Sequence, residues 1–384
     1  MITDDIRYIG VNDRDVDLFE GQYIVPNGIS YNSYVIMDEK IAVMDTVDSC
    51  KAEEFLANLE KALEGRTPDY LVISHMEPDH ASSIQMLVKK YPGITLVGNA
   101  KTFPMLSLYF PEIDLTNIIT VKENDTLKLG RHELTFVMAP MVHWPEVMVA
   151  YDSCDKVLFS ADGFGKFGAL DADEDWDCEA RRYYFNIVGK FGAQVQSLLK
   201  KADGLDIQII CPLHGPVLSG EAAVHALEKY QIWSSYGVES EGVFIAYATL
   251  HGNTEQAALK MAEILKADGC PKVAVANLAK DDMAEALEDA FRYGKMILAA
   301  SSYDGSVMPF MSDFLHHLQS KNFQKRMVGL IENGSWGPTA ARTMKGLLEQ
   351  MKDITIAETV VTIRGALKES DIPALEKLSQ EMMA

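Results

Sequence analysis

The sequence is poor in cysteine and has none of the spacings in which cysteines usually bind metals or exchange disulfides. Its five cysteines are spread along the chain, at Cys50, Cys154, Cys178, Cys211 and Cys270. Because none of them forms a CxxC pair, the sequence offers no zinc ribbon, cysteine-ligated iron–sulfur cluster or dithiol redox site. An odd number of cysteines without an export signal predicts reduced thiols, so we expect a cytoplasmic protein.

The sequence also lacks a long apolar segment and an excess of basic residues. No stretch approaches the roughly 20 uninterrupted apolar residues of a membrane helix, and residues 1–12 do not resemble a signal peptide. Lysine and arginine number 35 against 56 aspartates and glutamates, giving a net charge of −21. That charge disfavours binding to the phosphates of nucleic acid and to anionic lipid. We therefore expect neither nucleic acid nor a membrane as a partner.

The chain is long enough for two or three domains. Its 384 residues include 48% hydrophobic and 24% charged residues, an ordinary globular mixture. In the first 240 residues, helical spacing occurs at residues 53–63 and 179–200, and a turn at residues 38–40 predicts a hairpin. The strand-like apolar runs there lie at residues 33–37, 41–45, 71–74, 95–97, 134–138, 147–151, 157–159 and 207–211.

The pattern changes near Gly242 to a strict alternation of strands and helices. The strand-like runs lie at residues 243–248, 272–276, 296–300, 327–331 and about 360–363. The helical candidates between them lie at residues 254–267, 283–293, 310–318 and 339–351. This alternation predicts a doubly wound parallel sheet. With the polar stretch at residues 233–242 as a link, we expect domains at residues 1–238 and 242–384.

The densest group of chemically active side chains directly follows the apolar run at residues 71–74. Residues 74–81 contain four potential metal ligands, namely His75, Glu77, Asp79 and His80. In an extended segment alternate side chains share one side, so His75, Glu77 and Asp79 would converge. Pro78 would discourage a helix there. Imidazole and carboxylate groups at this density favour a metal site.

Three more candidate ligands, His143, Asp162 and His214, each come just after a predicted strand. Any one of them alone is more often a structural residue, but as a set they supply enough donors for two metal ions. Three aromatic residues are expected either around this site or in the core, namely Trp144, Tyr183 and Tyr184.

The order HxExDH followed by separated His, Asp and His resembles the metallo-β-lactamase-like pattern, with Glu77 where di-zinc hydrolases carry a second histidine. That variant, with a His-Trp-Pro segment at residues 143–145 and Glu-Ala-Arg-Arg-Tyr-Tyr at residues 179–184, resembles the flavodiiron proteins over essentially the full chain. The resemblance implies an N-terminal metallo-β-lactamase-like αββα sandwich with a non-haem di-iron centre. A flavodoxin-like, doubly wound five-stranded parallel sheet carrying FMN would follow.

The resemblance also implies roles for the ligands. His75, Glu77 and His143 would hold one iron, Asp79 and His214 would hold the other, and Asp162 would bridge them. His80 stays open, because members of the family differ on whether this histidine binds. A carboxylate in place of imidazole suits iron that cycles between ferrous and ferric states.

An anion-binding loop is predicted where the second half of the chain begins. Residues 249–255 read Thr-Leu-His-Gly-Asn-Thr-Glu between the first strand and the first helix. Hydroxyl groups flank a loop that opens a helix, so backbone N–H groups converge on an anion. Because the loop lacks the lysine of nucleotide-triphosphate loops, the phosphate of FMN fits better than ATP. A simple N-capping turn is the alternative.

Two further loops, at residues 301–306 and 333–337, follow the third and fourth strands. Both are expected at the carboxyl ends of parallel strands, where such sheets bind ligands, and Trp336 or Tyr303 could stack on a flavin ring. The predicted flavin-binding residues are Thr249, His251, Gly252, Asn253, Thr254, Ser301, Ser302, Tyr303, Asp304, Gly305, Asn333, Gly334, Ser335, Trp336 and Gly337.

The resemblance implies an oxidoreductase that reduces O2 to water, NO to N2O, or both. Its electrons would come from a separate donor, a rubredoxin-like protein or a reduced deazaflavin coenzyme, because the chain has no CxxC pairs of a fused rubredoxin. A head-to-tail homodimer, or a dimer of dimers, is also implied. The alternatives are a di-zinc hydrolase with a fused flavodoxin module and a redox sensor or electron carrier.

Overall fold

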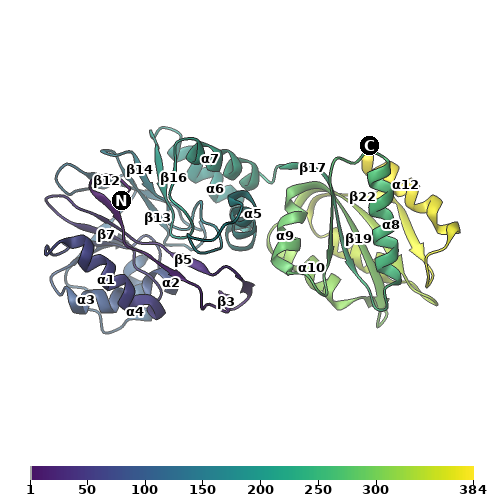
Figure 1. Cartoon of the computed structure of the whole chain (residues 1–384), viewed down its shortest axis with the longest axis horizontal. Helices are drawn as coiled ribbons and strands as arrows, with labels where there is room; N and C mark the ends of the chain where they lie inside the picture. Colours follow the sequence, from purple (N-terminus) through teal and green to yellow (C-terminus); the bar gives the residue numbers. More distant parts are fainter. Residues whose placement is uncertain (1) are drawn as a thin grey trace. The chain divides into compact units, whose positions relative to one another are not determined.

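The computed structural model describes residues 2–384, which divide into two units (Figure 1). The first unit runs to Tyr184 and includes Phe191–Gln231, and the second contains Phe185–Lys190 and Ile232–Ala384. The second unit thus takes in a short segment of residues 1–238. The domain boundaries expected from the sequence stay a prediction.

Two six-stranded sheets form the centre of the first unit, in the orders β1-β6-β7-β8-β9-β10 and β11-β12-β13-β14-β15-β16. The first sheet consists of Ile6–Tyr8, Tyr34–Ile36, Ala42–Met44, Tyr70–Val72, Thr95–Asn99 and Ile118–Val121. The second consists of Thr126–Lys128, Glu133–Met138, Met148–Asp152, Val157–Phe159, Ile209–Cys211 and Leu218–Ser219. Two small ribbons add β2 (Val11–Asp13) with β5 (Ile29–Tyr31), and β3 (Leu18–Phe19) with β4 (Tyr23–Ile24).

The core of this unit lies between the two sheets. Tyr34, Val72 and Val97 of the first sheet share one buried cluster with Phe136 and Phe159 of the second. Helices α1, α3 and α4 flank one side and α6 and α7 the other, which gives the expected αββα sandwich (Figure 1). The helices of this unit are α1 (Ala52–Leu63), α2 (Pro78–Ala81), α3 (Ile84–Lys90), α4 (Thr102–Tyr109), α5 (Trp176–Tyr183) and α6 (Gly192–Ala202); α7 (Glu221–Ser234) begins in it.

The second unit is the expected five-stranded parallel sheet, in the order β18-β17-β19-β21-β22, with the short β20 beside β19. Its strands are β17 (Ser240–Ala248), β18 (Val273–Asn277), β19 (Tyr293–Tyr303), β20 (Ser306–Val307), β21 (Gln324–Asn333) and β22 (Lys352–Ile363). Chain order reverses between β17 and β19. Ligands bind such sheets at that reversal.

Helices cover both faces of this sheet. Helices α8 and α12 lie on one side and α9 and α10 on the other (Figure 1). Ile245 and Tyr247 of β17 face α8 and α12, where they share a buried cluster with Met261 and Leu378. Phe244 faces the other side, where it packs against Phe314 of α10. The helices are α8 (Asn253–Ala267), α9 (Met283–Arg292), α10 (Pro309–Ser320), α11 (Ala340–Leu348) and α12 (Ile372–Met383). No helix within residues 2–384 is long and apolar enough to cross a bilayer.

The single helix predicted at residues 179–200 is wrong. The chain instead forms α5, a π-helical turn at Tyr184–Val188, a short 3₁₀ turn at Gly189–Phe191 and then α6. Two β-branched residues and a glycine weaken a helix at positions 187–189. Packing adds a second reason, because Phe185 stacks on Phe291 of the second unit with ring centroids 4.2 Å apart.

The same part of the second unit holds a buried cation. Arg326, only 3% exposed, donates to the carbonyl oxygens of Tyr236 at 2.9 Å, Gly237 at 3.0 Å and Phe291 at 2.5 Å. The hydroxyl of Tyr236 donates in turn to the Gly189 carbonyl at 2.8 Å. Burial lowers the pKa of Arg326 to about 10. These bonds tie the residues before β17 and the segment Phe185–Lys190 to the body of the second unit.

Candidate functional site

All seven predicted metal ligands come together in the first unit, on loops that follow its strands. His75 and Glu77 follow β8, and Asp79 and His80 lie in the short helix α2. The others lie between β12 and β13 (His143), after β14 (Asp162) and after β15 (His214). Their ligating atoms form two groups, one of His75, Glu77, His143 and Asp162 and one of Asp79, His80 and His214.

The extended conformation predicted through Pro78 is wrong. Pro78 is the first residue of helix α2, and the preceding Glu77 is its extended N-cap. Proline suits this position, because the first turn of a helix needs no N–H from it and the ring fixes φ near its helical value. The turn of α2 places Asp79 and His80 beside His214 in the second group. His75 and Glu77, which precede the helix, lie in the first group.

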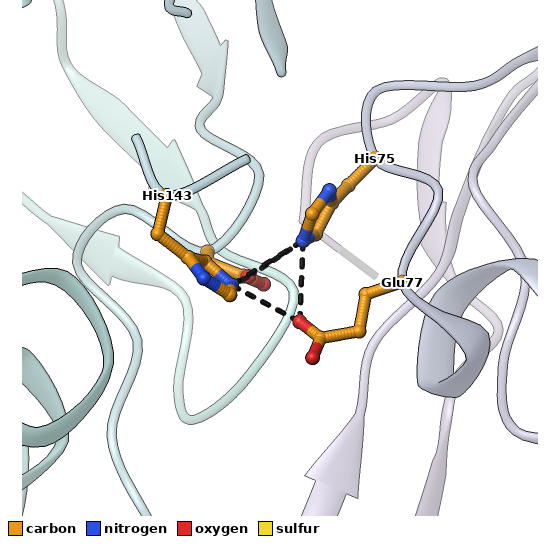
Figure 2. Close-up of side chains that lie close together, drawn as sticks. His75, Glu77 and His143 are labelled. Atoms are coloured by element: carbon orange, nitrogen blue, oxygen red, sulfur yellow. Dashed lines mark hydrogen bonds and ion pairs between the residues drawn. The ribbon is translucent and has the colours of Figure 1, made fainter. Parts of the chain in front are cut away.

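In the first group, His75 and Glu77 from one loop and His143 from another point at one another (Figure 2). The Nε2 atom of His75 lies 3.2 Å from Oε2 of Glu77 and 3.4 Å from Nε2 of His143. The Nε2 atom of His143 lies 3.0 Å from the same oxygen of Glu77. Asp162 completes the group, with its Oδ2 3.0 Å from His143 Nε2 and 3.2 Å from His75 Nε2.

In the second group, Nε2 of His214 lies 3.1 Å from both Asp79 Oδ2 and His80 Nε2. The second oxygen of Asp162, Oδ1, lies 3.1 Å from His80 Nε2 and 3.9 Å from His214 Nε2. The carboxylate of Asp162 therefore faces both groups, one oxygen to each. This is the geometry of a bridging ligand.

Two observations fit this cluster to a pair of metal ions. Ligands about 2.1 Å from one ion lie roughly 3 Å from one another when they occupy neighbouring positions around it, which is the spacing found here. Asp79 is 8% exposed, and neither of its carboxylate oxygens accepts a hydrogen bond. Its Oδ2 faces Nε2 of His214 at 3.1 Å and Nε2 of His80 at 3.3 Å, two further candidate ligands. Because burying a carboxylate costs free energy unless it is paired, a cation among these three groups would stabilise Asp79.

Hydrogen bonds orient two of the imidazoles for metal binding. Nδ1 of His75 donates to Glu146 Oε1 at 2.7 Å, and Nδ1 of His214 donates to the Ser30 carbonyl at 2.7 Å. Each bond fixes the tautomer in which the lone pair of Nε2 faces the site. His80 differs, because its buried Nδ1 has no hydrogen-bond partner.

Electrostatics in the cluster favour a bound cation. Burial alone would lower the pKa of His143, but hydrogen bonds to Asp162 and Glu77 raise it to about 9. Burial alone would raise the pKa of Asp162, but the charge of His75 and hydrogen bonds from the histidines hold it well below its usual range. The carboxylates thus retain protons on the imidazoles, and a metal ion binds by displacing those protons.

We predict that Glu146→Ala weakens metal binding about 10- to 100-fold, the usual effect of removing the hydrogen-bond partner of a ligand. Glu146 also accepts from the Met76 amide at 2.8 Å, so it supports the ligand loop as well. The measurement is iron retention during titration with a chelator. Glu146→Gln keeps an oxygen acceptor for His75 and should therefore lose less metal affinity than Glu146→Ala. Equal losses of affinity in the two variants would contradict the role of Glu146 as the hydrogen-bond partner of His75.

The aromatic residues singled out by the sequence divide into neighbours of the ligands and core residues. Trp144 packs edge-on against His75 with centroids 5.2 Å apart, and Tyr183 lies 5.5 Å from His214. Tyr184 packs instead against Tyr230 at 5.0 Å. Phe19 of β3 also covers His214, at 5.3 Å.

A second candidate site, a cavity of about 210 Å³, lies in the second unit. It is lined by fourteen of the fifteen residues predicted to bind flavin; Gly252, the N-cap of α8, is not among them. Ser301, Ser302 and Tyr303 belong to the end of β19 rather than to a loop after it. Trp336 is 93% exposed at the rim, and Tyr303 is 43% exposed. An aromatic surface is therefore available for a planar ligand.

Thr254→Val is predicted to weaken FMN binding about ten- to a hundredfold, because a hydrogen bond to a charged phosphate contributes roughly 1.5–3 kcal/mol. Thr254 is 1% exposed in the first turn of α8, and its hydroxyl lies 2.8 Å from that of Ser301. Flavin fluorescence titration of the flavin-free protein measures the affinity. If the Thr254 hydroxyl bonds only to Ser301 and not to phosphate, Thr254→Val will lower the midpoint of unfolding of the protein but leave its FMN affinity unchanged.

Sequence reasoning missed several residues at both sites. Glu146 and Ser30 hydrogen-bond to the candidate ligands His75 and His214, and Leu250, Thr339 and Gly365 line the cavity. Glu146 could have been suspected, because it stands three positions after His143 and ligating histidines usually need a second partner. The Ser30 carbonyl carries no sequence signal, since any residue supplies one.

Comparisons with known proteins agree with the two-domain architecture. A family model described as ODP family beta lactamase matches residues 29–215, and a flavodoxin domain model matches residues 244–384. An anaerobic nitric oxide reductase flavorubredoxin from Vibrio vulnificus is 30% identical, over 87% of this chain and 70% of its own length.

Two solved structures resemble the whole chain. The rubredoxin oxygen:oxidoreductase from Desulfovibrio gigas superposes with a TM-score of 0.92 at 25% identity, covering 100% of this chain and 97% of its own. The flavodiiron protein from Giardia intestinalis gives a TM-score of 0.90 at 25% identity, covering 100% and 96%.

Proposed function

The chain belongs to the flavodiiron protein family, and from this premise we propose that it reduces O2 to water, NO to N2O, or both. The observation that carries the proposal is the pair of facing donor groups with Asp162 between them. Its cofactors are FMN and a non-haem di-iron centre. When bound, they supply the redox chemistry: the flavin relays electrons and the irons receive the gas.

We propose that His75, Glu77 and His143 hold one iron, that Asp79 and His214 hold the other, and that Asp162 bridges them. Glu77 supports iron over zinc, because an anionic oxygen ligand stabilises the ferric state. We leave His80 outside this set: its Nδ1 lacks the partner that orients His75 and His214. Phe19, Trp144 and Tyr183 pack against the ligand rings and exclude water from them.

The metal ligands all belong to the first unit and the flavin-lining residues all belong to the second. We propose a head-to-tail homodimer, alone or as a dimer of dimers, in which flavin of one chain serves iron of the other. The proposed electron donor is a separate rubredoxin-like protein or a reduced deazaflavin coenzyme. Cys50, Cys154, Cys211 and Cys270 form no disulfide within the described residues, which supports our proposal of a reducing, cytoplasmic location.

Anaerobic consumption assays with each gas test the function. The iron-loaded, FMN-loaded protein is mixed with a chemically reduced rubredoxin, and NO or O2 is followed with an electrode. We expect steady turnover of at least one gas, and none after the flavin is removed. Two zinc ions per chain together with hydrolytic activity would overturn the proposal in favour of a hydrolase. Oxidation of the reduced protein once, without continued consumption of either gas, would overturn it in favour of a redox sensor or electron carrier.

A further inference from the structure

A small apolar cavity lies in the first unit, between its second sheet and helices α6 and α7, which flank that sheet (Figure 1). From the sheet it is lined by Val149 of β13 and Leu158 of β14. Leu198 of α6 and Leu227 of α7 line it from the helices. Its free volume is about 10 Å³, which is room for roughly one small molecule. All of the lining residues belong to the first unit.

The lining of this cavity suits an apolar molecule better than water. Among its ten lining residues, all but Ser160 carry hydrocarbon side chains. The Ser160 hydroxyl donates to the Gly163 carbonyl at 2.7 Å, so its proton is already used. A buried water molecule needs about three polar partners, whereas an apolar molecule gives up no hydrogen bonds on entering and gains dispersion contacts. The cavity is therefore expected to exclude water and to accept a small uncharged molecule.

The inner end of the cavity belongs to the turn that carries Asp162. Ser160 and Phe164, two positions before and two positions after Asp162, both line it, and they are 2% and 3% exposed. Packing holds this turn in place, because the Phe164 ring lies 4.1 Å from that of Tyr230 in α7 and the Phe164 N–H donates to the Tyr230 hydroxyl at 2.6 Å. The cavity and the proposed bridging ligand therefore lie at the same turn of the chain.

The outer end of the cavity lies near the protein surface. The residues that line it there are half-buried rather than fully buried, namely Leu199, Ala202, Leu205 and Leu227. Surface side chains change rotamer within nanoseconds, so a small molecule can pass between them without movement of the backbone. The cavity thus leads from the surface beside α6 and α7 to the turn of Asp162.

We propose that this cavity binds O2 or NO on its way to the metal centre. Both are small, uncharged diatomic molecules, and apolar surroundings favour such molecules over bulk water. A gas held here would be concentrated at the turn that bears Asp162. The inference rests on the proposed function, because only a chain that consumes a gas needs to concentrate one.

Krypton is a suitable probe of the site, because it is an uncharged apolar atom that anomalous X-ray scattering locates directly. Crystals of the full-length, iron- and FMN-loaded protein are pressurised with krypton, and we expect about one krypton atom in the cavity of each chain. Ala202→Phe fills the outer end and should remove this krypton. Val149→Ile adds a methylene from the sheet and serves as a second, milder variant. Ala193→Phe, at an exposed position of α6 outside the lining, is the matched control and should keep the krypton.

Kinetics then test whether the cavity lies on the route of the substrate. In both filled variants, kcat/KM for the gas should fall on the order of threefold to tenfold, because slower entry lowers the rate of association. Their kcat at saturating gas, their iron content and their FMN content should match those of the wild type and of Ala193→Phe.

The inference is wrong if the wild-type cavity takes up no krypton, or if the filled variants lose krypton yet keep the wild-type kcat/KM. An equal fall in kcat/KM in Ala193→Phe would also overturn it, because the loss would then come from changes in α6 rather than in the cavity. If the wild type binds krypton but consumes neither gas, the proposed function fails, and the role of the cavity fails with it.

Discussion

Replacing Asp162 by alanine is expected to empty both metal positions and to leave the flavin bound. Asp162 is fully buried, and it is the one ligand whose two oxygens face different donor groups. Without it, two cations would face each other with no anion between them, and each would lose a ligand. Elemental analysis should find little iron, while FMN absorbance stays at one flavin per chain.

The loss of gas reduction in this variant should be on the order of a thousandfold or more, because bound metal contributes several kcal/mol to such reactions. Asp152→Ala is the matched control. Asp152 is an equally buried aspartate of the first unit that pairs with His132 at 3.0 Å, outside the cluster. It should lower the stability of the protein without releasing iron. Full iron content in Asp162→Ala would exclude the bridging role.

Electron transfer between chains predicts that two inactive variants restore activity to each other. One carries His75→Ala with Asp79→Ala and keeps its flavin. The other carries Thr254→Ala with Gly334→Leu and keeps its iron. A side chain at Gly334 would come within 2.8 Å of the Pro338 backbone, so the loop beneath the flavin must shift.

Each variant alone should be inactive, whereas mixed dimers contain one intact pair of flavin and iron across the interface. If both proteins associate at random, about half of the dimers are mixed, so activity should rise from background to roughly a quarter of the wild-type value. Differently tagged chains purified in tandem isolate the mixed dimer for this measurement. If the isolated mixed dimer stays inactive, the head-to-tail arrangement is wrong.

The sequence predicted the architecture well because both halves carry strong local patterns. In the parallel sheet of the second unit, buried strands read as apolar runs, which makes them easy to find. The beginning of β22 was missed because residues 352–356 alternate and are largely exposed, with no apolar run. Helix α12 was also missed, although Pro373 in its first turn and buried Leu375, Leu378 and Met382 follow helical spacing.

The seven candidate ligands could be selected from the sequence because imidazole and carboxylate groups gathered after strands are rare outside metal sites, and the structure brings them together. Their conformation was not found, since Pro78 is compatible both with an extended chain and with the first position of a helix. The break at Tyr184–Val188 has a local reason in residues 187–189, but its second reason is the stacking of Phe185 on Phe291, a contact between positions distant in the chain. No local pattern in the sequence reveals such a partner.

The buried guanidinium of Arg326 has a consequence for how this kind of protein is inherited. A gene fragment that began at Gly242, where the strand and helix rhythm starts, would encode a sheet whose central arginine had lost the carbonyls of Tyr236 and Gly237. It would also lack Phe185–Lys190, which lies within the stretch that encodes the other unit. Recombination at that point would leave the second unit incomplete. The two halves are therefore expected to pass between genomes as one piece, with additional modules joined at the ends rather than inserted between them.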